Sequence, residues 1–182
     1  MSRLSNHVEP QGVTATARHY IRDLVYGAND GIITTFAVVA GVAGGSLSHT
    51  AVLVVGVANL AADGLSMAVG NFLSIRAHES AREAENLPEE EAHPWKHGLA
   101  TLFAFVVAGA LPLVPYVLGV GRGGFVWSTV LTLSALFGVG AARTAVTLDR
   151  WWKAGLEMLS LGVVVAGVAY GAGALIAGIV AP

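Results

Sequence analysis

The sequence predicts an all-α integral membrane protein with five transmembrane helices, and two observations carry this prediction. Of the 182 residues, 54% are hydrophobic and only 12% are charged, whereas a soluble domain carries about 25% charged residues. The mean hydropathy is accordingly positive, at +0.66. Five apolar stretches are separated by short polar segments, and each is close to or above the ~20 residues of helix that cross a hydrocarbon core.

The five predicted spans follow one another closely along the chain. They are residues 26–45, 51–75, 98–120, 125–148 and 155–180. Residues 1–25 are expected to form a cytosolic tail, in which residues 16–25 make a short amphipathic helix along the membrane surface. Residues 76–97 form the only sizeable polar connection, which is acidic, and Pro112 and Pro115 predict a kink in the third span.

The basic residues predict the orientation of these spans. With the N-terminus in the cytosol, only Arg122 among the lysines and arginines falls on the outer side. Because positive side chains concentrate on the cytosolic side of membrane proteins, we expect an N-in, C-out topology. Five spans cannot form two equal inverted halves, so any symmetry is expected to come from a homodimer. The inner basic residues are Arg3, Arg18, Arg22, Arg76, Arg82, Lys96, Arg143, Arg150 and Lys153.

The composition also excludes several classes of protein. The chain has no cysteine, which excludes disulfides and thiolate metal ligands, and its net charge of −2 comes without a basic cluster for nucleic acid. No Ser/His/Asp set or histidine-rich cluster is expected at membrane depth, so we predict neither an enzyme nor a permanently bound cofactor. Membrane lipid, a cation and a second copy of the chain are the expected partners.

One face of the second span is polar, although the span should lie in lipid. Each residue of a helix advances by about 100°. On that count Asn59, Asp63, Ser66, Met67 and Gly70 fall within an arc of about 100°. The polar atoms of the second span can therefore line a cavity between helices.

Only two acids, Asp30 and Asp63, lie well inside the spans, and no lysine or arginine lies at that depth. A carboxylate without a cation partner must be protonated, hydrated or bound to a mobile cation. At ~1.5 Å per residue, Asp30, Met67, Asp63 and Asn59 lie about 6, 12, 18 and 24 Å from the inner ends of their spans. These side chains could form a ladder that leads outward from the inner side.

The types of donor atom favour a transition metal. Carboxylate and amide oxygens are hard donors and a thioether is soft, a mixture that suits Fe²⁺ better than Mg²⁺ or Ca²⁺. We expect Asp30, Asn59, Asp63 and Met67 to bind metal, with Asp63 and Asp30 coupling its movement to protons. The structural alternatives stay open: a methionine can fill a core, an asparagine can join two helices, and a buried aspartate can be protonated.

The acidic connection offers a second, weaker candidate. Glu79 and Glu83 are four residues apart, so they share a face if the second helix continues beyond the membrane. They could collect metal on the cytosolic side, or they could simply form a solvated face. His19 and His49 are single histidines, which we expect at the membrane interface.

Several segments resemble the vacuolar iron transporter family, which includes yeast calcium-cross-complementing and plant nodulin-like proteins. Residues 30–37 (DGIITTFA) and 40–44 (AGVAG) are similar to the first-span signature of the family. Residues 56–59 (GVAN) and 65–70 (LSMAVG) resemble its second-span signature. Residues 112–116 (PLVPY) and 155–159 (GLEML) resemble its third and fifth spans.

The resemblance implies a homodimer that moves Fe²⁺, and often Mn²⁺, out of the cytosol in exchange for protons. The path would lie at the dimer interface, between the first and second spans. Asp30 and Met67 match the pathway aspartate and methionine of the family. Asn59 stands where the best-known members have a glutamate, and Asp63 lies one turn inward, where they have a small residue. Those members also insert a Glu- and Met-rich metal-binding domain where this chain has only residues 76–97.

Two other functions stay open on the sequence alone. The chain could transport another cationic substrate, with Asp30 and Asp63 as counter-charges, or it could be a membrane scaffold or sensor that transports nothing. The resemblance implies the inner membrane if the protein is bacterial and a vacuole-like organelle membrane if it is eukaryotic.

Overall fold

Helices make up all the long elements of this chain. The computed structural model describes residues 5–180, apart from the side chain of Arg122, so Arg3 of the orientation argument lies outside the described residues. The long helices are α1 (Val13–Gly44), α2 (His49–Ala84), α3 (Pro94–Gly109), α5 (Gly124–Ala142) and α6 (Trp151–Val180). The short ones are η1 (Leu111–Leu113), α4 (Val114–Val117), η2 (Gly121–Gly123) and η3 (Arg143–Ala145).

Five helical segments are long and apolar enough to cross a membrane, which confirms the predicted fold class of an all-α, multi-pass membrane protein. These segments are Val13–Gly44, His49–Ala84, Pro94–Val117, Gly124–Ala145 and Trp151–Val180. The orientation in the membrane and the homodimer stay predictions.

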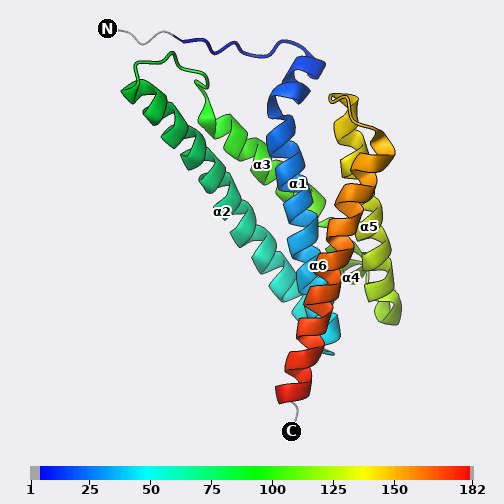
Figure 1. Cartoon of the computed structure of the whole chain (residues 1–182). Coiled ribbons are helices and arrows are strands. Elements are labelled where there is room, and N and C mark those ends of the chain that lie inside the picture. Colours follow the sequence, from blue (N-terminus) through cyan, green and yellow to red (C-terminus); the bar gives the residue numbers. More distant parts are fainter. Residues whose placement is uncertain (1–4, 181–182) are drawn as a thin grey trace.

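Helix α1 lies at the centre of the bundle and contacts α2, α3, α5 and α6. In Figure 1, α2 and α3 lie on one side of it and α5 and α6 on the other. Ile32, Phe36 and Val39 of α1 are fully buried or nearly so, together with Phe105 of α3. The N-terminal segment and the connection between α2 and α3 lie at one end of the bundle, and the C-terminus lies at the other (Figure 1).

Glycines bring α1 and α3 into backbone contact. A Cβ atom added at Gly27 would lie 2.5 Å from the carbonyl oxygen of Thr101. One added at Gly31 would collide with the carbonyl of Phe105, one turn further along both helices. Because apolar side chains gain little by leaving lipid, such close contact of small residues is what holds membrane helices together. The contact also fixes the position of Asp30, which precedes Gly31.

The start of the chain differs from the prediction. Residues 16–25, expected as a separate helix on the membrane surface, are the first turns of α1, which runs without interruption from Val13. No proline or glycine lies between Val13 and Gly27, so nothing breaks the helix there. The segment before α1 is also held in place: the backbone N–H of Asn6 donates to the carbonyl of Glu89 at 2.8 Å.

The third span is broken at its two prolines, as the sequence predicts. Helix α3 ends at Gly109, and the chain continues through the 3-10 turn η1 and the short helix α4. A proline cannot donate a helical hydrogen bond, so carbonyls of the preceding turn need other donors. The hydroxyl of Ser128, buried on α5, donates to the carbonyl oxygen of Pro112 at 2.7 Å.

Loss of this hydroxyl should destabilise the bundle. We expect Ser128→Ala to lower the free energy of unfolding by about 1–3 kcal/mol, because it leaves a buried carbonyl without a donor. Thermal unfolding in detergent would measure the change. Ser160→Ala is the matched control, since Ser160 is exposed and bonds only within its own helix. Equal melting curves for both variants would contradict the assigned role of Ser128.

Candidate functional site

The two intramembrane acids lie on neighbouring helices, Asp30 on α1 and Asp63 on α2. Both are half-buried, and Asp63 is close enough to act electrostatically on Asp30. Neither carboxylate has an ion-pair partner within residues 5–180. Two like charges that share an apolar bundle repel one another unless a proton or a cation lies between them. The pair is therefore suited to hold a cation.

A row of half-buried side chains continues the site along α2. Asn59, Asp63 and Met67 are four residues apart and so follow one another at each turn. They flank a buried seam, including Gly56 and Gly64, that packs on the side chains of the third span. Ser66 and Gly70, expected on the same polar face, are exposed instead. The row thus lies at the border between the packed and the open sides of α2.

Two amides beside the acids have buried polar atoms without a partner. The Nδ2 atom of Asn59 and the Oδ1 atom of Asn29 make no hydrogen bond to any described part of the chain. Unpartnered buried polar atoms are uncommon and call for a specific explanation, such as a water molecule or an ion. Since an amide can present its oxygen or its nitrogen, both side chains could serve as oxygen ligands. Sequence reasoning missed Asn29, and its position next to Asp30 was the available signal.

The third acid near a span, Glu157, already has an ion-pair partner. It is exposed near the start of α6 and forms an ion pair with Arg143 at 2.7 Å. The contrast with Asp30 and Asp63 shows that this bundle can neutralise an acid where it has an arginine. We therefore confine the candidate intramembrane site to Asp30, Asn59, Asp63 and Met67, with Asn29 added.

The two glutamates proposed to collect metal have different surroundings. Glu79 is buried, and its carboxylate accepts hydrogen bonds from the backbone N–H groups of Glu90 and Glu91 at 3.0–3.4 Å. It thereby holds the connection between α2 and α3 in place. Glu83 is exposed on the last turn of α2.

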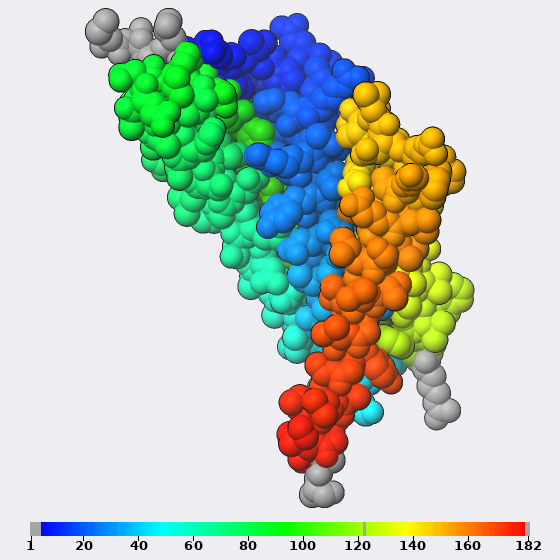
Figure 2. Space-filling model, viewed as in Figure 1, coloured from blue at the N-terminus to red at the C-terminus, as the bar shows by residue number. Residues whose placement is uncertain are grey.

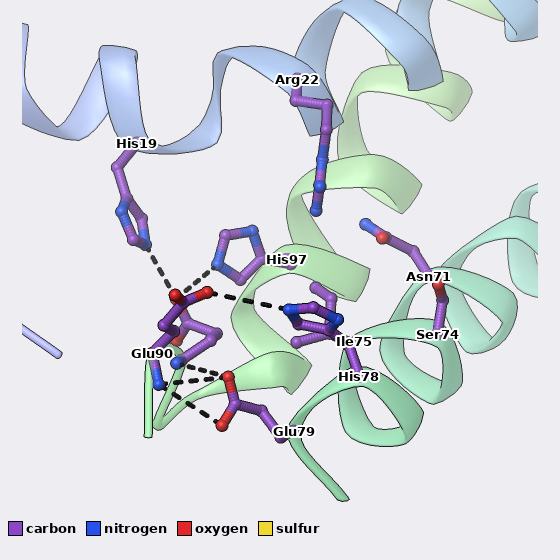
Figure 3. Close-up of a pocket in the computed structure, with 10 residues that line it drawn as sticks. His19, Arg22, Asn71, Ser74, Ile75, His78, Glu79, Glu90 and His97 are labelled. Carbon is purple, nitrogen blue, oxygen red and sulfur yellow. Dashed lines mark hydrogen bonds and ion pairs between the residues drawn. The ribbon is translucent and has the colours of Figure 1, made fainter. Parts of the chain in front are cut away.

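A polar pocket opens at the end of the bundle that carries the N-terminal segment. It has a volume of about 600 Å³. Its wall includes Asn71, Ser74 and His78. These residues lie on the same side of α2 as Met67, one to three turns further along the helix. His19 of α1 and His97 of α3 line it as well, and both point toward one carboxylate group (Figure 3). This row of side chains in α2 thus leads from the pocket to Asp63.

Comparisons with known proteins identify relatives of this chain. A model of the VIT family matches residues 21–92 and 81–174. Vacuolar iron transporter 1 of Eucalyptus grandis is 28% identical over 214 aligned positions, which cover 86% of each chain. Vacuolar iron transporter homolog 1 of Oryza sativa subsp. japonica is 31% identical, over 88% of this chain and 75% of the relative. A vacuolar iron transporter of Toxoplasma gondii is 38% identical, but over only 56% of this chain and 36% of its own.

The alignments also show that this chain is shorter than one of its relatives. The 214 aligned positions with the Eucalyptus protein exceed the 182 residues of this chain, so that relative carries residues that this chain lacks. The two segments that match the family meet at residues 81–92, in the connection between α2 and α3. With most of its length matched, from Ile21 to Ala174, this chain belongs to the VIT family.

Proposed function

We propose that this protein transports a divalent transition metal, Fe²⁺ or Mn²⁺, out of the cytosol in exchange for protons. One observation carries the proposal. Asp30 and Asp63 interact across α1 and α2 without a basic partner among the described residues, and unpartnered amides lie beside them. Relatives of the chain are named vacuolar iron transporters, which supports a metal as the substrate.

The donor set supports a transition metal over an alkaline-earth ion. The oxygens of Asp30, Asn59 and Asp63 are hard ligands, and the thioether of Met67 is soft. Mg²⁺ and Ca²⁺ prefer oxygen ligands alone. In this proposal Asp30 and Met67 bind the metal, Asn59 adds an oxygen or a hydrogen bond, and Asp63 binds either metal or proton. Competition between the two at Asp63 couples their movements.

The distribution of charge supports the direction of transport. Among the described residues, the basic ones other than Arg122 belong to the first turns of α1, the last turns of α2, the start of α3 and the region from η3 to the first turn of α6. These parts lie toward the end of the bundle that carries the N-terminal segment (Figure 1). By the positive-inside rule this end faces the cytosol. Metal then enters from the pocket and moves outward past Met67 and Asp63.

The surface of the bundle supports a homodimer. Val54, Val57, Leu65, Val69 and Leu73 of α2 are exposed. They lie beside the half-buried row that holds Asp63, so a second copy on this face would close the path. Helix α6 is exposed along most of its apolar length, and its C-terminal part extends beyond the other helices (Figure 2). In this proposal the exposed side of α6 faces lipid.

A flux assay tests the proposed function. Purified protein in liposomes should carry Fe²⁺ and Mn²⁺ faster than Co²⁺ or Zn²⁺, and an imposed pH gradient should increase the initial rate. Protein-free liposomes are the control. A flux rate that does not change with the pH gradient would refute the antiport mechanism. Flux of an organic cation that no metal inhibits, and that Met67→Leu leaves unchanged, would instead favour a transporter of another cation.

A further inference from the structure

Three side chains in the polar pocket are arranged as metal ligands. The Nε2 atom of His97 lies 2.9 Å from Oε2 of Glu91, and the Nε2 atom of His19 lies 3.2 Å from the same oxygen. All three ligand atoms lie within 4.8 Å of one another. Ligands at about 2.1 Å from a metal and 90° apart are separated by about 3 Å. The two distances from Glu91 therefore fit neighbouring ligand positions on one metal ion.

A second layer of contacts holds His97 in place. Its Nδ1 atom lies 2.5 Å from Oδ2 of Asp23, which is buried. The amide of Asn71 donates to the other oxygen of Asp23 and to the hydroxyl of Thr101, both at 2.8 Å. Metal-binding histidines commonly donate their second ring nitrogen to a carboxylate, which fixes the ring and leaves Nε2 for the metal. His97 has this arrangement.

Glu91 is available as a charged ligand. The backbone N–H of His93 donates to its Oε1 atom at 2.7 Å, and its Oε2 atom faces the imidazoles of His19 and His97. The nearby arginines are engaged with other acids: Arg82 pairs with Glu90 at 2.8 Å, and the exposed Arg22 lies 3.8 Å from Asp23. A third imidazole, that of His7, lies further from Oε2 of Glu91, with its Nδ1 atom at 3.6 Å.

We propose that His19, Glu91 and His97 form a second metal site, which takes up a divalent transition metal at the N-terminal end of the bundle. Two histidines and one carboxylate on one face, with open positions opposite, form a ligand set typical of Fe²⁺. The site combines α1, α3 and the connection between α2 and α3. It rests on the proposed function in one respect, that the bound metal passes along Asn71 and Ser74 to Met67.

The neighbouring group of His7, Glu9 and His93 is a weaker candidate. These residues also bring their ligand atoms within 4.8 Å of one another. However, Lys96 forms a close ion pair with Glu9 and would compete with a metal for that carboxylate. This group therefore serves as a comparison in the experiment.

Metal binding in a transport-independent background tests the site. Tag-free Asp30→Asn/Asp63→Asn protein in detergent should still bind one Co²⁺ per chain, measured by titration calorimetry. Adding His19→Gln or Glu91→Gln should weaken this binding at least about tenfold. His93→Gln and His49→Gln should leave the Co²⁺ affinity unchanged. In a second measurement, bound Co²⁺ should protect His19 but not His49 from modification by diethylpyrocarbonate, which mass spectrometry detects. His19 and Glu91 are preferred to His97, whose removal would disturb the buried Asp23.

The outcomes separate this inference from the proposed function. Unchanged Co²⁺ affinity in both the His19→Gln and Glu91→Gln proteins would overturn it, as would loss in His93→Gln alone or no binding by the folded Asp30→Asn/Asp63→Asn protein. Binding at His19 in a protein that moves no metal would uphold the site and refute the transport proposal. If both hold, His19→Gln should raise the metal concentration for half-maximal flux about tenfold, with the maximal rate unchanged.

Discussion

Asp63→Asn should abolish proton-coupled metal flux in liposomes. The substitution keeps the shape of the side chain but removes the group that can exchange a proton for a metal ion. Asp63 is half-buried and has no ion-pair partner in the described chain, so the fold should survive. Net uptake driven by a pH gradient should fall to the rate of protein-free liposomes.

Metal counterflow would separate the two roles of Asp63. With metal on both sides of the membrane, exchange of labelled for unlabelled Mn²⁺ needs no net movement of protons. If Asp63 mainly carries protons, Asp63→Asn should retain part of this exchange and lose its response to pH. Glu85→Gln is the matched control, because Glu85 is an exposed acid at the end of the same helix. Uptake that still depends on pH in the Asp63→Asn protein would refute the proton-coupling role of Asp63.

The intramembrane part of the site could be located from the sequence for a physical reason. In an apolar bundle with few charges, Asp30 and Asp63 are conspicuous, and the helical period alone puts Asn59, Asp63 and Met67 in one row. The structure places all three at half-buried positions. Ser66 and Gly70 show the limit of that reasoning, because an arc of 100° is wide enough to include positions that face outward.

The pocket at the N-terminal end could not be located in the same way. His19, Glu91 and His97 belong to α1, the connection and α3, and no periodicity relates residues on different elements. The close contact of Gly27 with Thr101 holds α1 against α3, about two turns after His19 and one turn after His97. The surroundings of Glu79 could not be inferred either, because a helix surface pattern cannot show that the backbone N–H groups of Glu90 and Glu91 would donate to its carboxylate.

The connection between α2 and α3 bears on the difference in length between this chain and its relatives. The two segments that match the family overlap at residues 81–92, within this connection, and the Eucalyptus alignment is longer than this chain. The connection contributes Glu91 to a pocket formed by the ends of α1 and α3. In the proposed mechanism, these imidazole and carboxylate ligands form a compact uptake site.

Asp30→Asn should have a different effect from Asp63→Asn, because Asp30 is proposed to hold the metal in every step. We expect the variant to lose both pH-driven uptake and Mn²⁺ counterflow, each falling to the background of protein-free liposomes. Circular dichroism and size-exclusion chromatography would show whether the bundle is intact, and Asp149→Asn, an exposed acid outside the helices, is the control. Counterflow retained in Asp30→Asn but lost in Asp63→Asn would reverse the two roles. Because Asp30 and Asp63 interact electrostatically, neither measurement alone separates their roles. Comparing pH-driven uptake with Mn²⁺ counterflow in both variants assigns metal to one carboxylate and proton to the other.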